Sequence, residues 1–330
     1  MRPFRYERAT DADQAVALIT AEPEAKFLGG GTNLVDLMRL GVAAPGTLID
    51  VTGLAGQDRI EETAGGGLRI GAGVTNSDLA ADVRVRDRYP VLSEAVLHGA
   101  SGQLRNLATV GGNLLQRTRC AYFQDVTKPC NKRSPGSGCP AREGDHHNLA
   151  IIGHSRNCVA TQPSDMSVAL TALDATVHVR GPSGERAIPM PGFHRLPGDE
   201  PQRDTVLDPN ELITTVELAP RARATRQRYR KVRERRSFAF ALVSIAAVVE
   251  FEGQTATDVC IALGGVAHVP WRAITAEDEL RGAEITEDAV RRAAEAELAQ
   301  AEPLRDNGYK VELARNLIVR TLLELAEPGA

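Results

Sequence analysis

Two glycine-rich stretches decide the fold of this chain: Leu28-Gly29-Gly30-Gly31-Thr32-Asn33-Leu34 and Arg105-Asn106-Leu107-Ala108-Thr109-Val110-Gly111-Gly112-Asn113-Leu114. In each, a residue typical of β-strands leads into Gly-Gly, and Asn follows closely. Because glycine has no Cβ, consecutive glycines can turn several backbone N–H groups toward one point and let a phosphate approach. Two such loops in one chain favour a pyrophosphate, which has two phosphates to hold, over two unrelated turns.

The first stretch matches neither of the common phosphate-binding motifs. It lacks the Gly-Lys-Ser/Thr that completes a P-loop. Leu34 stands where a Rossmann fingerprint has its third glycine. The glycines alone therefore indicate phosphate contact without identifying the fold.

The composition of the chain is that of an ordinary globular protein. Its 330 residues are 42% hydrophobic and 25% charged, which excludes collagen, coiled coil and wholesale disorder and suggests two or three domains. A formal net charge of −4 gives no general reason to bind nucleic acid. The longest mostly apolar run, residues 238–249, is too short to span a membrane, and no signal peptide is expected.

The pattern along the chain predicts three regions: residues 1–57 as a small α/β unit, 58–220 as a second α/β unit, and 221–330 as a strand pair followed by helices. Residues 117–158 show no periodicity and predict a long inserted loop, which is uncommon unless it has a function. Helix starts are expected at Thr10 with Asp13, at Asn76 or Ser77, and at Thr286.

Four of the five cysteines lie on this loop or at its exit: Cys120, Cys130, Cys139 and Cys158. They contain no Cys-x-x-Cys pair, so the spacing is that of neither a zinc ribbon nor a bacterial ferredoxin. Zinc, an iron–sulfur cluster and two disulfides all stay open, and unrelated buried cysteines are the plain alternative. Cys260 lies in an apolar strand pattern and is expected in the core.

The histidines suggest no catalytic group. His146 and His147 lie on the cysteine loop, where we expect them to be solvated or to support the ligands. The others are scattered: His98, His154, His178, His194 and His268. Residues 221–236 carry nine Lys or Arg in sixteen positions, which indicates a solvated strand edge or, as a sharper hypothesis, a docking face for an acidic partner.

The two glycine stretches, with Pro163-Ser164-Asp165 after them, resemble the FAD-binding subunit of the molybdenum hydroxylases, the family of xanthine dehydrogenase, aldehyde oxidoreductase and carbon monoxide dehydrogenase. The resemblance covers essentially the whole chain. It implies an α+β fold, with two FAD-binding subdomains of the vanillyl-alcohol-oxidase (PCMH) type and a C-terminal α+β domain of the carbon monoxide dehydrogenase flavoprotein type.

The resemblance also implies which residues bind FAD. The pyrophosphate would lie on the backbone of Phe27, Leu28, Gly29, Gly30, Gly31, Thr32, Asn33 and Leu34, with Thr109, Gly111, Gly112 and Asn113 completing the cradle. Asp165 would bind the ribityl or adenosine side. Lys231 and Leu207 match family positions near the flavin or adenine, on weaker grounds than the glycine loops.

Two branches of the family carry an inserted cysteine loop that binds a [4Fe–4S] cluster: the bacterial three-subunit aldehyde oxidoreductases and the 4-hydroxybenzoyl-CoA reductases. Cys120-Ala-Tyr-Phe-Gln and Cys130-Asn-Lys-Arg-Ser-Pro-Gly-Ser-Gly-Cys139 are more similar to the aldehyde oxidoreductase branch. That branch implies Cys120, Cys130, Cys139 and Cys158 as the four cluster ligands.

The resemblance therefore implies the FAD-binding subunit of a heterotrimeric, molybdenum-dependent aldehyde oxidoreductase. Its partners would be a large molybdenum-cofactor subunit and a small subunit with two [2Fe–2S] centres, and electrons would leave FAD for an external acceptor. No side chain need act as a catalytic acid or base. The alternatives are a 4-hydroxybenzoyl-CoA reductase-like or xanthine dehydrogenase-like complex and, in another class, a zinc-stapled nucleotide-binding module. Because related enzymes carry the export signal on the small subunit, a periplasmic or a cytoplasmic location is expected.

Overall fold

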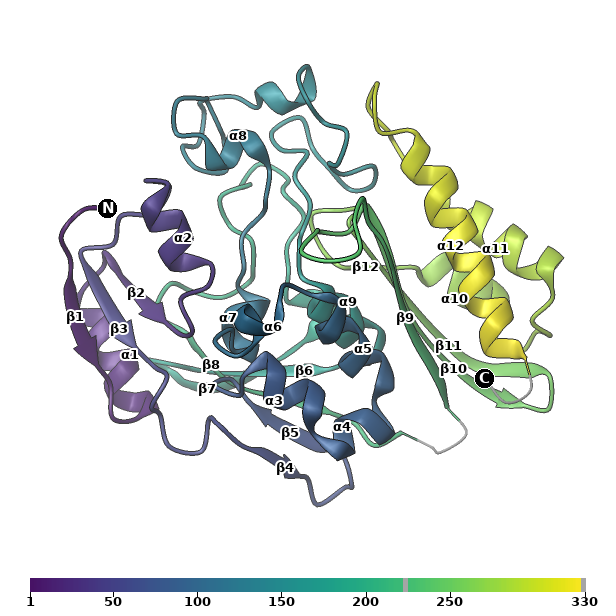
Figure 1. Ribbon diagram of the computed structural model, residues 1–330, viewed down its shortest axis with the longest axis horizontal. Coiled ribbons are helices and arrows are strands. Elements are labelled where there is room, and N and C mark those ends of the chain that lie inside the picture. Colours follow the sequence, from purple (N-terminus) through teal and green to yellow (C-terminus); the bar gives the residue numbers. More distant parts are fainter. Residues whose placement is uncertain (222–224, 328–330) are drawn as a thin grey trace.

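The computed structural model describes residues 1–221 and 225–327 (Figure 1). The described residues form three sheets, which we call N-terminal, central and C-terminal. The N-terminal sheet is parallel with strand order β1-β3-β2, and α1 packs against it. Its elements are β1 (Arg5–Arg8), α1 (Ala12–Ala21), β2 (Ala25–Leu28), α2 (Leu34–Arg39) and β3 (Thr47–Asp50). The first glycine loop connects β2 to α2, so it lies at the carboxyl end of a parallel strand.

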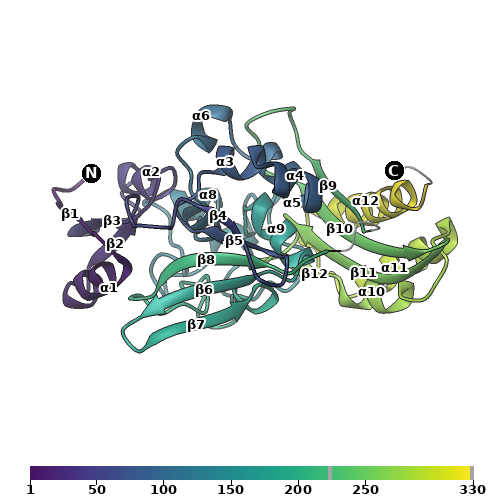
Figure 2. The same ribbon diagram turned by 90° about the horizontal axis from the view of Figure 1, so that it is seen from below.

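The central sheet has the strand order β4-β5-β8-β6-β7 and is antiparallel. Its strands are β4 (Ile60–Glu62), β5 (Leu68–Gly71), β6 (Thr176–Gly181), β7 (Gly184–Pro189) and β8 (Leu212–Leu218). The helices that share its core are α3 (Asn76–Ala81), α4 (Val83–Arg88), α5 (Pro90–His98), α7 (Val110–Leu114) and α9 (Asp165–Ala172). In Figure 2, α3, α4 and α6 (Gly102–Arg105) lie on one side of this sheet.

The cysteine loop crosses above the central helices at the top of Figure 1 and has little regular structure. Its short elements are α8 (Ala121–Gln124) and η1 (Pro140–Arg142); η2 (Met190–Gly192) follows the central strand β7. The loop has a small apolar core of its own, which includes Cys120, Cys130 and Cys158 together with Phe123.

The C-terminal sheet has the order β12-β11-β10-β9 and carries helices on one face. Its elements are β9 (Arg226–Val232), β10 (Val243–Glu252), β11 (Thr255–Gly264), β12 (Trp271–Arg272), α10 (Ile274–Leu280), α11 (Glu287–Leu298) and α12 (Tyr309–Ala326). Its other face meets α5 and α9 of the central region. Residues 243–249 of β10 are all buried because the strand is covered on both faces, and this explains the continuous apolar run in the sequence. None of the helices in the described residues has the length and apolarity that a membrane crossing needs.

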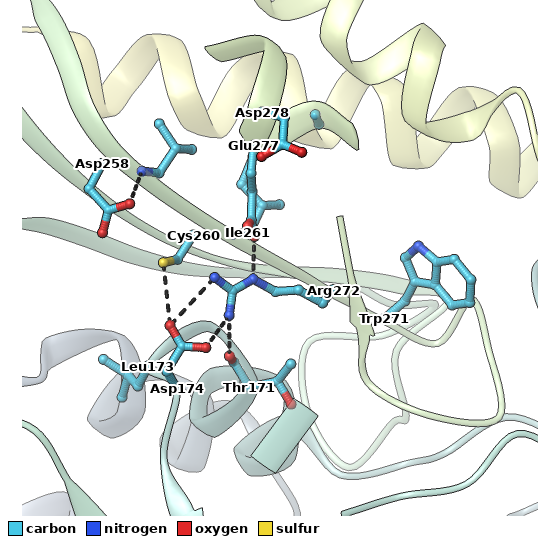
Figure 3. Close-up of polar contacts among 12 residues, drawn as sticks. Thr171, Leu173, Asp174, Asp258, Cys260, Ile261, Trp271, Arg272, Glu277 and Asp278 are labelled. Atoms are coloured by element: carbon cyan, nitrogen blue, oxygen red, sulfur yellow. Dashed lines mark hydrogen bonds and ion pairs between the residues drawn. The ribbon is translucent and has the colours of Figure 1, made fainter. Parts of the chain in front are cut away.

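A partly exposed arginine ties the C-terminal sheet to the central region (Figure 3). Arg272 on β12 donates to Asp174 Oδ1 at 2.5 Å and to the Thr171 carbonyl at 3.0 Å, both near the end of α9. Its Nε also pairs with the buried Glu277 of α10. Cys260 lies beside this cluster, 3.7 Å from Asp174 Oδ2, and is buried as predicted. The arginine therefore joins β12 to the end of α9 and to α10 through two ion pairs, one with the buried Glu277 and one with Asp174, whose side chain is half exposed.

Two of the three predicted helix starts need correction. Asp11, not Thr10 with Asp13, caps α1 by accepting the Gln14 N–H at 2.8 Å. Thr75, not Asn76 or Ser77, caps α3 by accepting the Asp78 N–H at 3.1 Å. In both cases the cap is the last residue with extended backbone, which the sequence does not reveal when several polar residues stand together. Thr286 caps α11 as predicted.

Candidate functional site

A deep cleft of about 960 Å³ lies where the two glycine loops meet the segment after η2. This volume is at the upper end of the range for cofactor and small-molecule sites. The cleft is lined by most of the predicted FAD residues: Phe27, Gly29, Gly30, Gly31, Thr32, Asn33, Leu34, Thr109, Gly111, Gly112 and Leu207. Four predicted residues are not among its lining residues: Leu28, Asn113, Asp165 and Lys231.

The first glycine loop needs its glycines for two different reasons. A Cβ on Gly30 would lie 1.7 Å from the carbonyl oxygen of Leu107, so the two loops touch at backbone distance. Gly31 has φ +73°, a conformation that residues with a Cβ rarely adopt. The tight contact and the left-handed turn together hold the loop open toward the cleft.

The first loop also offers donors to the cleft. Within residues 1–221 and 225–327, no protein acceptor takes the backbone N–H groups of Gly30, Gly31, Thr32 and Asn33. The Asn33 side chain accepts the Arg117 N–H at 2.9 Å through Oδ1, while its buried Nδ2 has no partner. Successive free N–H groups with an amide donor beside them form the kind of concavity that binds anions.

The second glycine loop uses its donors differently. The N–H groups of Val110 and Gly111 donate to the carbonyls of Val74 and Ala72, each at 2.9 Å. The Gly112 N–H donates to Thr109 Oγ1 at 3.2 Å, so Thr109 caps α7. The glycines here serve close packing, since a Cβ on Gly111 would lie 3.1 Å from the Cβ of Ala72. The second loop therefore forms a wall of the cleft whose backbone donors are already occupied.

Three of these four residues, Asn113, Asp165 and Lys231, lie in a polar network beside the second loop, and Leu28 does not. Asn113 Oδ1 accepts from Ser164 Oγ at 2.6 Å. Asp165, the next residue, pairs with Lys231 Nζ at 2.7 Å and accepts from Tyr229 Oη at 2.5 Å. The Asp165 and Lys231 side chains are only 7% and 1% exposed. The structure thus brings Asp165 and Lys231 together, although neither is among the residues that line the cleft.

Several residues that the sequence did not single out also line the cleft. His194 Nδ1, His268 Nε2 and Gln202 Oε1 are buried there, and no residue in the described part of the chain forms a hydrogen bond with them. Burial lowers the pKa of His194 and of His268 to about 4, so both rings are neutral near neutral pH. Single histidines on separate segments carry no sequence signal, and only the fold brings them to one cavity.

All four loop cysteines line a second, smaller cavity. They are free thiols, so the disulfide alternative is wrong. Burial raises the pKa of Cys120 to about 11 and that of Cys158 to about 12. Among the described residues, no three His, Cys, Asp or Glu side chains are grouped to hold one metal ion. The four thiols therefore surround one small space, and the residues described as lining it include no His, Asp or Glu side chain.

Neither loop histidine lines the cysteine cavity, although His146 Nδ1 lies 3.2 Å from the carbonyl oxygen of Ala141, which does. His146 is 1% exposed and not solvated. Its Nε2 accepts the Asp306 N–H at 3.1 Å. His147 stacks on the ring of Tyr309 with 4.7 Å between ring centroids. Both contacts come from residues 306–309, at and just before the start of α12, which the sequence could not place beside this loop.

Several arginines of the predicted docking face are engaged within the chain. Arg228 pairs with Glu94 at 3.2 Å, and Arg230 pairs with Glu324. Arg233 donates to the His98 carbonyl at 3.0 Å. Residues 222–224 lie outside the described part. Much of this basic stretch therefore joins β9 to α5 and α12, and its role as a docking face stays a prediction.

Comparison with known protein families identifies the chain. Residues 2–221 match the family described as the FAD-binding domain in molybdopterin dehydrogenase, and residues 227–325 match the carbon monoxide dehydrogenase flavoprotein C-terminal domain. The chain belongs to the FAD-binding subunits of the molybdenum hydroxylase family. Both the predicted family and the predicted fold are confirmed, as is the assignment to an oxidoreductase.

Individual relatives extend over the whole chain. The aldehyde oxidoreductase FAD-binding subunit PaoB of Escherichia coli is 49% identical over 326 residues, which is 98% of each chain. The glyceraldehyde dehydrogenase medium chain of Sulfolobus acidocaldarius is 25% identical and covers 98% of each. A solved chain of the carbon monoxide dehydrogenase from Hydrogenophaga pseudoflava is 28% identical, with a TM-score of 0.78 over 99% of this chain and 98% of its own. The non-catalytic zinc-stapled module is thereby overturned.

Proposed function

We propose that this protein is the FAD-binding electron-transfer subunit of a molybdenum-dependent aldehyde oxidoreductase. The likeness to an aldehyde oxidoreductase subunit along nearly its full length supports the aldehyde as substrate class. The partners would be a large subunit with the molybdenum cofactor and a small subunit with two [2Fe–2S] centres, as in a heterotrimer. The chain would share the compartment of those partners, whether cytoplasmic or, by co-export, periplasmic.

The cleft is the proposed FAD site, and the observation that carries the proposal is the set of free donors on the first glycine loop. The N–H groups of residues 30–33 and Asn33 Nδ2 point to an anion, as a pyrophosphate provides. Unpartnered atoms of His194, Gln202 and His268 would meet other polar parts of the cofactor. FAD, when bound, would supply the electron transfer between the iron–sulfur centres and an external acceptor. The protein would hold it, orient it and limit its access to water.

The cysteine cavity is the proposed [4Fe–4S] site, with Cys120, Cys130, Cys139 and Cys158 as ligands. Four free thiols around one cavity match the number that a cubane requires. Because burial disfavours free thiolates there, the negative ligands would be stabilised mainly by the iron.

An anaerobic visible spectrum of the purified chain, with iron and acid-labile sulfide assays on the same sample, tests both sites. Flavin bands with a broad iron–sulfur shoulder and about four irons per flavin are expected. Flavin without iron would contradict the cluster and leave the FAD site standing. Flavin with zinc in place of iron would also contradict the cluster and leave the FAD site standing. A sample shown to have retained its cofactors that lacks flavin would contradict the proposed use of the cleft.

A further inference from the structure

A fully buried lysine stands between the cysteine cavity and the FAD cleft. Lys132 lies two residues after Cys130 and lines the cysteine cavity, and its side chain is 0% exposed. A buried ammonium group is costly unless it is paired and hydrogen-bonded. A lysine buried among the cysteines therefore needs a partner that compensates its positive charge.

The partner of Lys132 belongs to the other cavity. Lys132 Nζ pairs with Asp204 and also donates to the Pro201 carbonyl at 2.7 Å. Asp204 lines the FAD cleft and accepts from Arg117 Nε at 2.7 Å through its second oxygen. We call Lys132, Asp204 and Arg117 the ion triad. It connects a side chain of the cysteine cavity to two side chains of the cleft.

Arg117 extends the triad back to both sites. Its backbone N–H donates to Asn33 Oδ1 on the first glycine loop at 2.9 Å. Its guanidinium lies over the ring of Phe123, 4.8 Å from the centroid, and Phe123 lines the cysteine cavity. The wall between the two cavities is thus built from charged groups and one aromatic ring.

The charges in this wall are fixed in sign. Burial opposes ionisation of Asp204, but the cations Lys132 and Arg117 outweigh it and lower its pKa to about 2. The carboxylate therefore stays negative, between one cation on the cysteine side and one on the cleft side. A group bound to the four cysteines would meet the positive end of the triad first.

We propose that Lys132 sets the reduction potential of the cluster, with Asp204 as the positioning residue that holds the ammonium between the two cavities. The inference rests on the proposed [4Fe–4S] site. One-electron reduction of a cluster held by the four cysteines would add one negative charge, which the buried ammonium of Lys132 would stabilise; Lys132 itself would exchange no proton and form no bond. Charge and burial around a cluster are known determinants of its potential.

The test is a potentiometric titration of the iron–sulfur signal in the assembled enzyme, followed by electron paramagnetic resonance. K132M should lower the ratio of reduced to oxidised cluster about tenfold at the wild-type midpoint, which corresponds to 59 mV for a one-electron couple. K132R should restore a value near wild type. D204N, which removes the anion and keeps the lysine, should shift the potential upward. K128M, at an exposed lysine of the same loop, should change nothing measurable.

The expected shifts in reduction potential have opposite signs in K132M and D204N. This separates an electrostatic role of the triad from a structural one, because loss of packing would shift the potential of both variants in the same direction. An iron-loaded K132M with the wild-type potential would overturn this inference alone. A wild-type enzyme without iron would overturn the proposed cluster and the inference with it. If K132M loses its iron, the reduction potential of the cluster in D204N becomes the deciding measurement. An unchanged or lowered potential in D204N would contradict the proposal.

Discussion

The FAD cleft and the cysteine cavity lie side by side but are built in different ways. The cleft is bordered by elements of the N-terminal and central sheets, and its donors are backbone groups held by those elements. The cysteine cavity lies in a loop whose small apolar core includes three of the proposed ligands. We therefore expect the cleft to keep its shape when a cysteine is replaced, whereas the loop should lose order when its cysteines cannot bind a cluster. FAD and iron should therefore be separable in variants.

The largest effect is expected from Gly30→Ala. Its Cβ would lie 1.7 Å from the Leu107 carbonyl oxygen, so the two glycine loops would have to separate. Overpacking of this kind costs about 3 kcal/mol of unfolding free energy. Flavin content after purification and urea unfolding should both fall. Gly102→Ala is the matched control, because a Cβ there meets nothing within 4 Å. Normal flavin content in Gly30→Ala would show that the contact between the loops is not needed.

Cys158→Ser should remove the cluster while leaving the flavin. The loss of one of four ligands should reduce iron per flavin to less than half and make residues 117–158 more sensitive to proteolysis. Cys260→Ser is the control, since Cys260 lies in β11 away from the cavity, and it should retain both cofactors. Joint loss of iron and flavin in Cys158→Ser would contradict the independence of the two sites.

Asn33→Asp tests the donor set of the first loop. The change replaces the free Nδ2 donor by a carboxylate oxygen that would repel a pyrophosphate. FAD affinity should fall about tenfold or more, since hydrogen bonds to charged groups contribute about 1.5–3 kcal/mol. Fluorescence titration of the FAD-free protein measures it. Asn106→Asp adds the same charge at an exposed position of the second stretch, outside the cleft lining, and should bind FAD normally.

A more gradual effect is a pH dependence of stability that belongs to the cleft. His194 and His268 have pKa values lowered to about 4 in the folded state, against 6.5 when exposed. The unfolded chain therefore binds more protons between these values, and stability falls as the pH drops from 6.5 toward 4. The slope is at most about 1.4 kcal/mol per pH unit for each histidine.

Urea unfolding of the FAD-free protein at pH 7 and 5 measures this slope. His194→Gln should make it shallower, while His147→Gln, at an exposed ring on the cysteine loop, should leave it as it is. An identical slope in His194→Gln would mean that this ring is protonated equally in both states.

The sequence by itself determined the family, the order of the α/β and β–α regions, and the set of cysteines on one loop. These follow from local patterns: glycines that must lie at a strand end, an apolar run that must be buried on both faces, and polar residues without periodicity. The presence of most predicted glycine-loop residues in the cleft lining has the same origin, since the signal is contiguous in the chain.

Only the tertiary structure decided how the two glycine loops differ and what separates the two cavities. The N–H groups of Val110 and Gly111 are occupied because the fold places the carbonyls of Val74 and Ala72, from a distant segment, beside them. The N–H groups of residues 30–33 meet no such acceptor among the described residues. Asp204, Lys132 and His268 belong to three parts of the chain and carry no common motif. Buried charges acquire their roles from neighbours in space, because the cost of burial and the attraction of a partner both depend on packing.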